Sequence, residues 1–552
     1  MSTPISAFSV YRKKPNLKIV KRQSIVKKQT QVKKKITISL KNCMNKIKQK
    51  KTSGIPQKLQ DTVQPRAVVS SNLNQNFEKV KNKIKKTPSP LCTEFKKGTV
   101  FHNKDPVSES LKLFKWLIAP LSPTSFFKQY WEVKALHIQH NSAYYFSDIL
   151  TTAKLDSIFR KFPLYYTKNV DVVSYENGLK EVHNEEGKVV ASALYDYYAN
   201  GCSIRLLNPQ TYDQRVHLLV STLQEYFGTL VGANIYLTPP NSQGFAPHYD
   251  DIEAFVIQLE GRKHWKLYKP RDSDVLARES SPNLRHDDIG KPFMEVTLNA
   301  GDILYFPRGT IHEGRTDPDC HSFHITVSVY QHNSFADLLE YALPEALKKA
   351  SFDNVHFRKG LPLNYLKHTG YVNRNIISEE RVNIMAEIQK LFDSLRDYID
   401  IDKAADQLGR RFMYDSMPPV LSKQEIFHTS KYDGDIMKEG KILNRAEFDM
   451  DTEVRLLRYF CVRLVIDEEC SKLYYNTENA KMYHGEEEQV LVIDFNLIPT
   501  IEMLQSTYPK FTNIKSLVVN NNSNIATIQL VSDLWERGLL ITNNSLTTVI
   551  GD

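Results

Sequence analysis

One pattern constrains this chain more than any other: His248-Tyr-Asp250, with a further histidine, His312, later in the chain. On a β-strand, residues two apart point to the same face, so we expect His248 and Asp250 to reach one ion. His312 follows the turn signal Pro307–Gly309 and is the expected third ligand, from a separate strand. Two neutral imidazoles and a carboxylate that leave coordination positions open are the ligand set of non-haem Fe(II) oxygenases. Zinc accepts the same set in catalytic sites, so the triad alone does not choose the metal.

The segment after the first two ligands predicts a hairpin that carries a buried lysine. Phe255–Leu259 is an apolar strand, Glu260–Arg262 a turn, and Lys263–Tyr268 the return strand. By alternation Lys263 shares a face with Trp265, which places an ammonium group among core side chains. A buried ammonium needs an anionic partner, and no acidic residue of the return strand is placed to serve. A dicarboxylate such as 2-oxoglutarate would serve, with one end on iron and the far carboxylate on Lys263.

Two further segments alternate polar and apolar residues, as strands with one polar face do. The polar faces hold Asn234, Tyr236 and Thr238 in the first segment and His324, Thr326 and Ser328 in the second. Such a face usually lies in water. In a small barrel it can instead line a pocket, which is the interpretation that the metal ligands favour.

These segments resemble the Jumonji-C family of Fe(II)- and 2-oxoglutarate-dependent oxygenases, and within it the nucleolar ribosomal oxygenases. Members of that subgroup are described as bifunctional lysine-specific demethylases and histidyl-hydroxylases. The resemblance rests on residues 248–263 (HYDDIEAFVIQLEGRK) and 301–312 (GDILYFPRGTIH), and it extends from Leu121 to the C-terminus. It implies an α+β fold with a double-stranded β-helix core of the cupin or jelly-roll type. A helical dimerisation region and a C-terminal winged-helix-like domain would follow this core.

The resemblance also implies the residues of the site and their roles. His248, Asp250 and His312 would be the catalytic residues that bind Fe(II); Lys263 and Asn234 would bind 2-oxoglutarate; Arg205, Tyr236 and Ser328 would contact the substrate peptide. The implied reaction uses 2-oxoglutarate and O2 as cosubstrates and hydroxylates a substrate carbon. The implied substrates are a histidine of a large-subunit ribosomal protein, methylated lysines of the histone H3 tail, or both. The protein would accordingly act in ribosome biogenesis, or in chromatin and transcription regulation.

Two other functions stay open on the sequence alone. A catalytically idle cupin scaffold could tether nucleolar or chromatin partners, although the complete ligand set and Lys263 argue against it. A zinc hydrolase would give Lys263 no role. A second histidine with carboxylates, His286-Asp287-Asp288, lies in the polar, turn-rich segment 269–302 and is predicted to be an ordinary surface feature.

Residues 1–100 carry 25 Lys and Arg against 3 Asp and Glu, a net charge of +22. Since the whole chain has a net charge of +10, the remaining residues are near −12. Lysine clusters spread among Gln, Asn, Ser and Thr predict a disordered basic arm. Such clusters are typical of nuclear or nucleolar targeting and of non-specific attraction to nucleic-acid phosphates.

The six cysteines show neither paired metal spacing nor a secreted disulfide framework, so we expect a reducing compartment. No apolar stretch is long enough for a signal peptide or a membrane span. The sequence therefore predicts a soluble intracellular protein.

The chain is predicted to divide into the basic arm at 1–100, a catalytic domain at 101–345, a helical dimerisation region at 346–425 and a winged-helix-like domain at 426–552. Helices are expected after the start signal at Ser122 and over Asp213–Phe227. A helix over Ser334–Lys349 is expected to break or kink at Pro344.

The apolar residues Met385, Ile388, Phe392, Leu395 and Ile399 recur at spacings of three and four. This is the seam of a helix that packs on another helix, either within the chain or in a homodimer. The resemblance favours the homodimer.

In the C-terminal part, Val490–Phe495 is predicted as a buried strand. Helical stretches around Ile501–Leu504 and Ile528–Arg537 follow, and then a short hairpin is expected at Gly538-Leu-Leu-Ile-Thr, as in a winged helix. Residues 426–552 contain 12 basic and 19 acidic residues, which argues against phosphate binding and for protein contacts.

Overall fold

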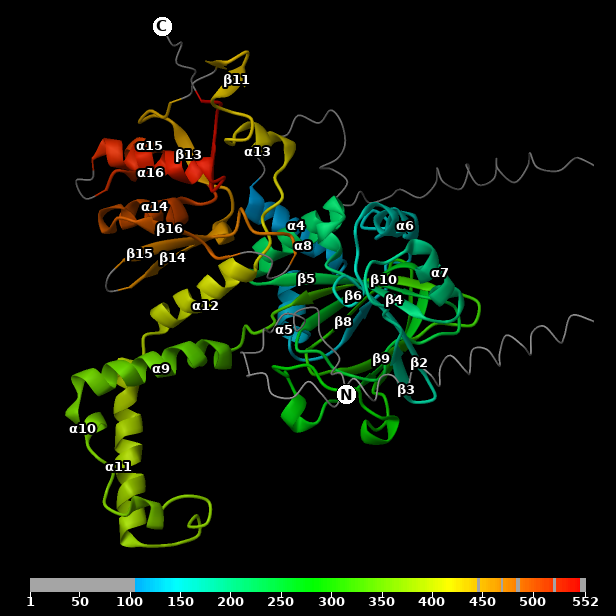
Figure 1. Cartoon of the computed structure of the whole chain (residues 1–552), viewed down its shortest axis with the longest axis horizontal. Helices are drawn as coiled ribbons and strands as arrows, with labels where there is room; N and C mark the ends of the chain where they lie inside the picture. The colour runs from blue at the N-terminus through cyan, green and yellow to red at the C-terminus, as the bar shows by residue number, and fades with distance from the viewer. Residues whose placement is uncertain (1–104, 444–446, 468–469, 483–486, 520–522, 547–552) are drawn as a thin grey trace, which may run out of the picture. The chain divides into compact units, whose positions relative to one another are not determined.

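In the computed structural model, the long strand β6 (Glu253–Tyr268) is central to the fold, because its two halves pair with different strands. Its first half pairs with β8 (Ile303–Phe306) and β10 (Ser322–Val329). Its second half pairs with β7 (Met294–Asn299) and β9 (Ile311–Arg315). One strand shared by two sets of partners rolls the sheet into the predicted double-stranded β-helix (Figure 1).

The structure describes residues 105–546 apart from 444–446, 468–469, 483–486 and 520–522. The predicted basic arm, residues 1–100, lies outside the described residues. Among the helices in the described part, none has the length and apolar character needed to cross a bilayer.

The main sheet runs in the order β1-β8-β6-β10-β5-β4-β2-β3, with neighbouring strands antiparallel. Its other strands are β1 (Leu136–Ile138), β2 (Val170–Glu176), β3 (Leu179–Val182), β4 (Ser203–Leu207) and β5 (Val231–Thr238). The helices of this part are α4 (Pro106–Leu117), α5 (Pro123–Gln129), α6 (Thr152–Lys161), α7 (Ala191–Ala199) and α8 (Gln214–Phe227). The sequence correctly predicted α5, capped by Ser122, and α8, capped by Asp213.

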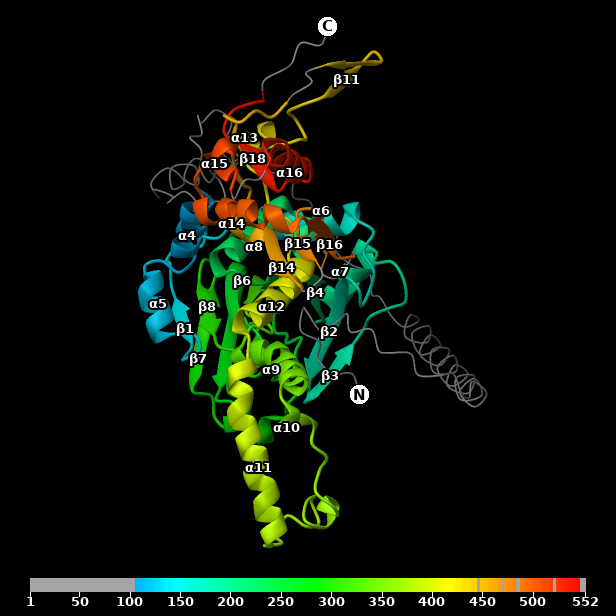
Figure 2. The ribbon, with the colours of Figure 1, turned by 90° about the vertical axis from the view of Figure 1, so that its left-hand side faces the viewer.

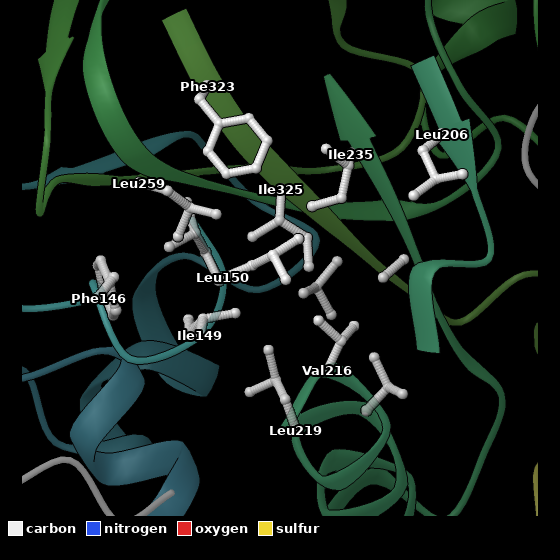
Figure 3. Close-up of a cluster of buried hydrophobic side chains, with 14 of the residues drawn as sticks. Phe146, Ile149, Leu150, Leu206, Val216, Leu219, Ile235, Leu259, Phe323 and Ile325 are labelled. Carbon is white, nitrogen blue, oxygen red and sulfur yellow. The ribbon is translucent and has the colours of Figure 1, made fainter. Parts of the chain in front are cut away.

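One face of the main sheet packs against α8 and the neighbouring loops. Ile235 of β5 and Ile325 of β10 meet Leu219 of α8 in a continuous apolar core, shown in Figure 3. The opposite faces of the same two strands carry the polar residues that the alternation predicted. This division leaves the polar faces pointing into the barrel, where the functional side chains gather.

The predicted turn at Glu260–Arg262 is wrong, because β6 continues through it without a break. Gly261 adopts φ +67°, and a β-carbon there would lie 1.9 Å from the His321 carbonyl oxygen. The glycine therefore lets the strand change direction against β10, whose register shifts at Phe323 and His324. The turn signal marks a bend within one strand instead of a hairpin.

The helical region comprises α9 (Phe335–Asp353), α10 (Val355–Arg358), α11 (Glu379–Leu395) and α12 (Ile401–Asp415). Of the predicted break or kink at Pro344, the break is wrong, since α9 runs through that residue. The same helix crosses the predicted domain boundary at residues 345 and 346. Leu395 packs with Ala346 and Ala350, so part of the predicted seam is buried within the chain.

The C-terminal part has its own apolar core. Its elements are α13 (Lys423–Phe427), β11 (Ile436–Lys438), β12 (Lys441–Leu443), β13 (Glu453–Leu456), β14 (Val462–Ile466), β15 (Ser471–Tyr475), β16 (Gln489–Ile493), α14 (Ile498–Thr507), β17 (Thr512–Asn513), α15 (Ile514–Leu517), α16 (Asn524–Glu536) and β18 (Leu540–Thr542). Figure 2 shows α14 and α16 in this part. Strand β16 is less buried than predicted, because Val490 and Val492 are exposed.

Candidate functional site

Three side chains of the predicted triad meet at one point. The Nε2 atoms of His248 and His312 lie 4.0 Å and 3.9 Å from Oδ2 of Asp250. Ligand atoms of all three residues lie within 4.8 Å of one another, and no other such cluster occurs in the described residues. The prediction that these residues converge is confirmed at the level of geometry.

The strand assignment of the first two ligands is wrong. His248 and Asp250 precede β6 in an irregular segment, and only His312 lies on a strand, β9. Two backbone hydrogen bonds, N–H of each histidine to the carbonyl of the other at 3.2 Å and 2.8 Å, join His248 to His312. The Gly309 amide donates to the Asp250 carbonyl at 2.9 Å. Pairing with distant residues, instead of strand alternation, therefore sets the triad's geometry.

Both histidines are oriented by the same local device. Nδ1 of His248 lies 2.8 Å from the Ala246 carbonyl, and Nδ1 of His312 lies 3.0 Å from the Thr310 carbonyl. Since a carbonyl only accepts, each Nδ1 carries the proton and each Nε2 offers a lone pair toward Asp250. Burial lowers the pKa of His248 and lowers that of His312 to about 4, so both imidazoles are neutral, as metal ligation requires.

Lys263 extends into the same pocket from β6. Its side chain is buried, and its only hydrogen-bond partner among the described residues is Thr238 Oγ1 at 3.3 Å. No carboxylate in the described part of the chain forms an ion pair with it, and burial lowers its pKa to about 7. A buried ammonium without a carboxylate fits an anionic ligand held beside the triad.

Gly314, two residues after His312 on β9, makes room for this lysine. A β-carbon at Gly314 would lie 2.9 Å from Cε of Lys263 and 3.2 Å from ring atoms of Trp265. The indole Nε1 of Trp265 is buried without a hydrogen-bond partner in the described residues. Alternation along the strand predicted Trp265 on the same face as the lysine, without a role in the site.

The remaining predicted site residues also line the pocket: Asn234, Tyr236, Arg205 and Ser328. Oδ1 of Asn234 is buried without a partner among the described residues. The ring of Tyr236 stacks on His324 with centroids 4.8 Å apart. The Arg205 Nε donates to Asp171 at 3.0 Å. The structure thus brings together in one pocket all eight site residues named from the sequence, the three of the triad included.

Several residues of the pocket were not predicted from the sequence, among them Lys180, Phe245, Glu313 and Gly314. Lys180 lies on β3 with its ammonium 4.8 Å from the centre of the Phe245 ring. Phe245 comes from the loop after β5, so neither residue carried a local signal. Burial is the main cause that lowers the pKa of Lys180, to about 8.

The second histidine considered as a ligand, His286, lies outside the triad. Its Nε2 lies 3.0 Å from Glu313 Oε1, in a segment folded against the ligand-bearing loop. The Leu284 amide, for example, donates to the Pro247 carbonyl at 2.8 Å. The segment 269–302 therefore packs against the loop that carries His248 and Asp250. The residues of this segment alone did not predict that contact.

Comparison with known proteins gives two domain matches. A sequence profile described as "JmjC domain" matches residues 205–338. A second, described as "Ribosomal oxygenase 1, C-terminal winged helix domain", matches residues 417–546.

The chain is also similar to whole proteins. "Bifunctional lysine-specific demethylase and histidyl-hydroxylase NO66" of Aedes aegypti is 44% identical over 441 residues, which cover 79% of this chain and 68% of that protein. "Ribosomal oxygenase 1" of Danio rerio is 43% identical over 442 residues, covering 79% and 80%. The match to a solved structure of E. coli ycfD covers 77% of this chain and 98% of that chain at 14% identity, with a TM-score of 0.43.

Proposed function

The chain belongs to the Jumonji-C family that contains ribosomal oxygenase 1 and NO66, and from that premise we propose its substrate and the roles of its residues. It is an Fe(II)- and 2-oxoglutarate-dependent protein oxygenase. Its proposed substrate is a histidine side chain of a large-subunit ribosomal protein. The observation that most supports the oxygenase activity is Lys263, a buried ammonium without a carboxylate partner among the described residues, in one pocket with two neutral histidines and an aspartate.

The residues present fit the metal and the cosubstrate. His248, Asp250 and His312 would hold Fe(II) through two Nε2 atoms and one carboxylate oxygen. Lys263 would bind the far carboxylate of 2-oxoglutarate, and the side-chain amide of Asn234 would contribute a hydrogen bond. When bound, iron and 2-oxoglutarate supply the activation of O2 that places a hydroxyl group on an unreactive carbon.

The protein's own groups orient the metal ligands and the substrate. The Ala246 and Thr310 carbonyls hold the two imidazoles in the ligating tautomer. Arg205, Tyr236 and Ser328 are proposed to contact the substrate peptide, because all three line the pocket. Hydroxylation at a histidine β-carbon leaves a stable product, whereas hydroxylation at an N-methyl group of lysine releases formaldehyde.

A second candidate substrate is a methylated lysine of the histone H3 tail. The printed name of the Aedes aegypti relative includes lysine-specific demethylase as well as histidyl-hydroxylase. We rank the ribosomal histidine first, and the same iron centre could serve both reactions.

Mass spectrometry tests both substrates. Ribosomal large-subunit proteins and H3 peptides are incubated with the protein, Fe(II), 2-oxoglutarate and O2. A ribosomal histidine heavier by one oxygen supports the hydroxylase, and formaldehyde release supports the demethylase. The product should vanish in His248→Ala and persist in His264→Ala, a half-exposed β6 histidine bonded to Thr297 outside the pocket. If neither product forms under turnover conditions, the enzymatic proposal is refuted.

The alternative, a catalytically idle scaffold, makes a different prediction about metal. Purified protein that binds neither Fe(II) nor Mn(II) near one equivalent would favour the scaffold. Loss of that binding in His312→Ala would favour the enzyme.

We also propose a homodimer formed through α9 and α11. These helices expose the large apolar side chains of Phe335, Leu339, Leu347, Ile388 and Phe392. Large apolar side chains exposed in number on neighbouring helices are typical of protein interfaces. Here Phe335 and Phe392 are 87% and 65% exposed, values that a monomer would leave in water.

The location and the outer parts of the chain complete the proposal. We propose that the chain divides functionally near residues 100, 345 and 425, although α9 continues across the second of these positions. The basic residues 1–100 would direct the protein to the nucleus and nucleolus and contact nucleic-acid phosphates non-specifically. The acidic C-terminal part would bind a protein partner. A fusion of residues 1–100 to a fluorescent protein that stays outside the nucleolus would contradict this role.

A further inference from the structure

Lys180 places a positive charge in the metal pocket that the roles above do not use. It lies on β3, at the edge of the main sheet, and it lines the pocket together with the triad. It forms no ion pair with a carboxylate in the described part of the chain. Its ammonium lies 4.8 Å from the centre of the Phe245 ring, and the guanidinium of Arg205 lies 5.4 Å from the same ring.

The carboxylates that line the pocket are already engaged. Asp250 belongs to the triad. Glu313 accepts hydrogen bonds from Tyr268 at 2.6 Å and from Gln243 at 3.0 Å, and it contacts His286 at 3.0 Å. Among the described residues of the pocket, no carboxylate is left to receive a cationic side chain of a substrate.

The aromatic faces of the pocket are engaged as well. Cations lie near the ring of Phe245, and the ring of Tyr236 stacks on His324 at an interplanar angle of 6°. Lys263 lies 5.3 Å from the centre of the Trp265 ring, and the Phe306 ring lies 4.6 Å from the ring of His312. Binding of a methylated ammonium ordinarily uses open aromatic faces or a carboxylate. The described pocket offers this group neither, and it adds the charge of Lys180.

From this arrangement we infer that Lys180 is a specificity-determining residue, which admits a neutral side chain such as imidazole to the metal pocket and opposes a methylated ammonium. The inference rests on the proposed function, because it concerns which of the two named substrate classes the same site accepts. The repulsion acts on any cationic side chain that reaches the pocket and leaves a neutral ring unaffected. Lys180 thereby separates the two candidate activities by charge.

Peptide binding tests this inference independently of turnover. Two peptides that differ only at the target position, histidine in one and trimethyl-lysine in the other, are titrated against the full chain loaded with Mn(II) and an inert 2-oxoglutarate analogue. The measured quantity is the dissociation constant of the trimethyl-lysine peptide divided by that of the histidine peptide. Removing the charge in Lys180→Gln should lower this ratio at least about fivefold, as expected for two charges a few ångströms apart near a protein surface.

Matched variants distinguish the charge from the shape of the side chain. Lys180→Arg keeps the charge and should leave the ratio within about twofold of the unmodified protein. Lys168→Gln removes an exposed lysine that does not line the pocket and should leave the ratio unchanged. Mn(II) binding near one equivalent shows that each variant is folded.

The inference is overturned if Lys180→Gln binds Mn(II) normally and leaves the ratio unchanged, or if Lys168→Gln shifts it equally. The proposed function fails separately, when the unmodified protein hydroxylates no histidine peptide while the binding ratio still responds to Lys180.

Discussion

The guanidinium of Arg308 lies 2.8 Å from the carboxylate of Glu253, although both side chains are buried. Arg308 also pairs with Glu132, and Tyr305 donates to the second oxygen of Glu253. The residue after Arg308, Gly309, donates its amide to the carbonyl of the ligand Asp250. The buried pair therefore holds the turn that connects the two ligand-bearing segments.

Replacing Arg308 by Met should destabilise the protein and weaken the metal site. Removing one partner leaves Glu253 buried without its guanidinium, and such losses typically destabilise a protein by about 3–5 kcal/mol. Thermal unfolding and Mn(II) titration measure the two effects. The double variant Glu253→Met with Arg308→Met should recover part of the stability, and a double variant as unstable as the summed single variants would contradict this account.

Replacing Lys263 by Met should abolish binding of 2-oxoglutarate and spare the metal. Loss of a buried charge partner for a carboxylate corresponds to about 3–5 kcal/mol, which is more than roughly 100-fold in Kd. Calorimetric titration of the Mn(II)-loaded protein with 2-oxoglutarate measures this dissociation constant. Unchanged affinity in Lys263→Met would remove this lysine from the site.

Binding of 2-oxoglutarate should weaken as pH rises above neutrality. Burial lowers the pKa of Lys263 to about 7, so above that pH the amine must take up a proton when the dicarboxylate binds. The affinity should fall by up to about tenfold per pH unit. Titrations at pH 8.5 in two buffers of different ionisation enthalpy should show proton uptake, which Lys263→Met should lack.

The same shift has the opposite sign for the stability of the protein without an anion. The unfolded chain, with the ordinary lysine pKa of 10.5, keeps a proton that the folded state releases above about 7. The contribution of Lys263 to stability therefore rises with pH between about 7 and 10.5. A comparison of unfolding in the unmodified protein and in Lys263→Met across this window isolates the effect.

Replacing Gly314 by Ala should impair use of the cosubstrate selectively. The added methyl group would lie 2.9 Å from Cε of Lys263, which must then move away from its buried position. We expect the KM for 2-oxoglutarate to rise roughly 10- to 100-fold while Mn(II) affinity is retained. Gly360→Ala, where nothing lies within 4 Å, is the control. An unaltered KM in Gly314→Ala would show that the lysine adapts freely.

Replacing Phe392 by Glu should dissociate the proposed homodimer. The side chain is 65% exposed on α11, and a charge there would be buried at the interface. Light scattering after size-exclusion chromatography measures the mass. Ile525→Glu changes an 81% exposed residue of α16 and should leave the mass as it was. A monomeric unmodified protein would refute the homodimer.

Several features followed from the sequence because they depend on neighbours in the chain. Helix starts at Ser122 and Asp213 depend on capping, which acts within one turn. The polar and apolar faces of β5 and β10 follow from the alternation of side chains along a strand. The residue types of the triad and the burial of Lys263 were likewise predicted, from the ligands that iron prefers and from the alternation along the strand.

Other features were decided only by contacts between distant segments. His248 and Asp250 were placed on a strand, but backbone pairing with His312 and Gly309 positions them. The turn expected at Glu260–Arg262 is a bend, because β6 finds different partners on its two sides.

What the sequence determined by itself was therefore the chemistry available to this protein: two histidines, one aspartate and an inward lysine. The tertiary structure alone decided that Lys180, Phe245 and Gly314 join them in one pocket. The physical reason is that alternation and capping act over a few residues. Closure of the sheet, by contrast, brings together residues that are far apart in the chain, and local sequence patterns do not predict such contacts.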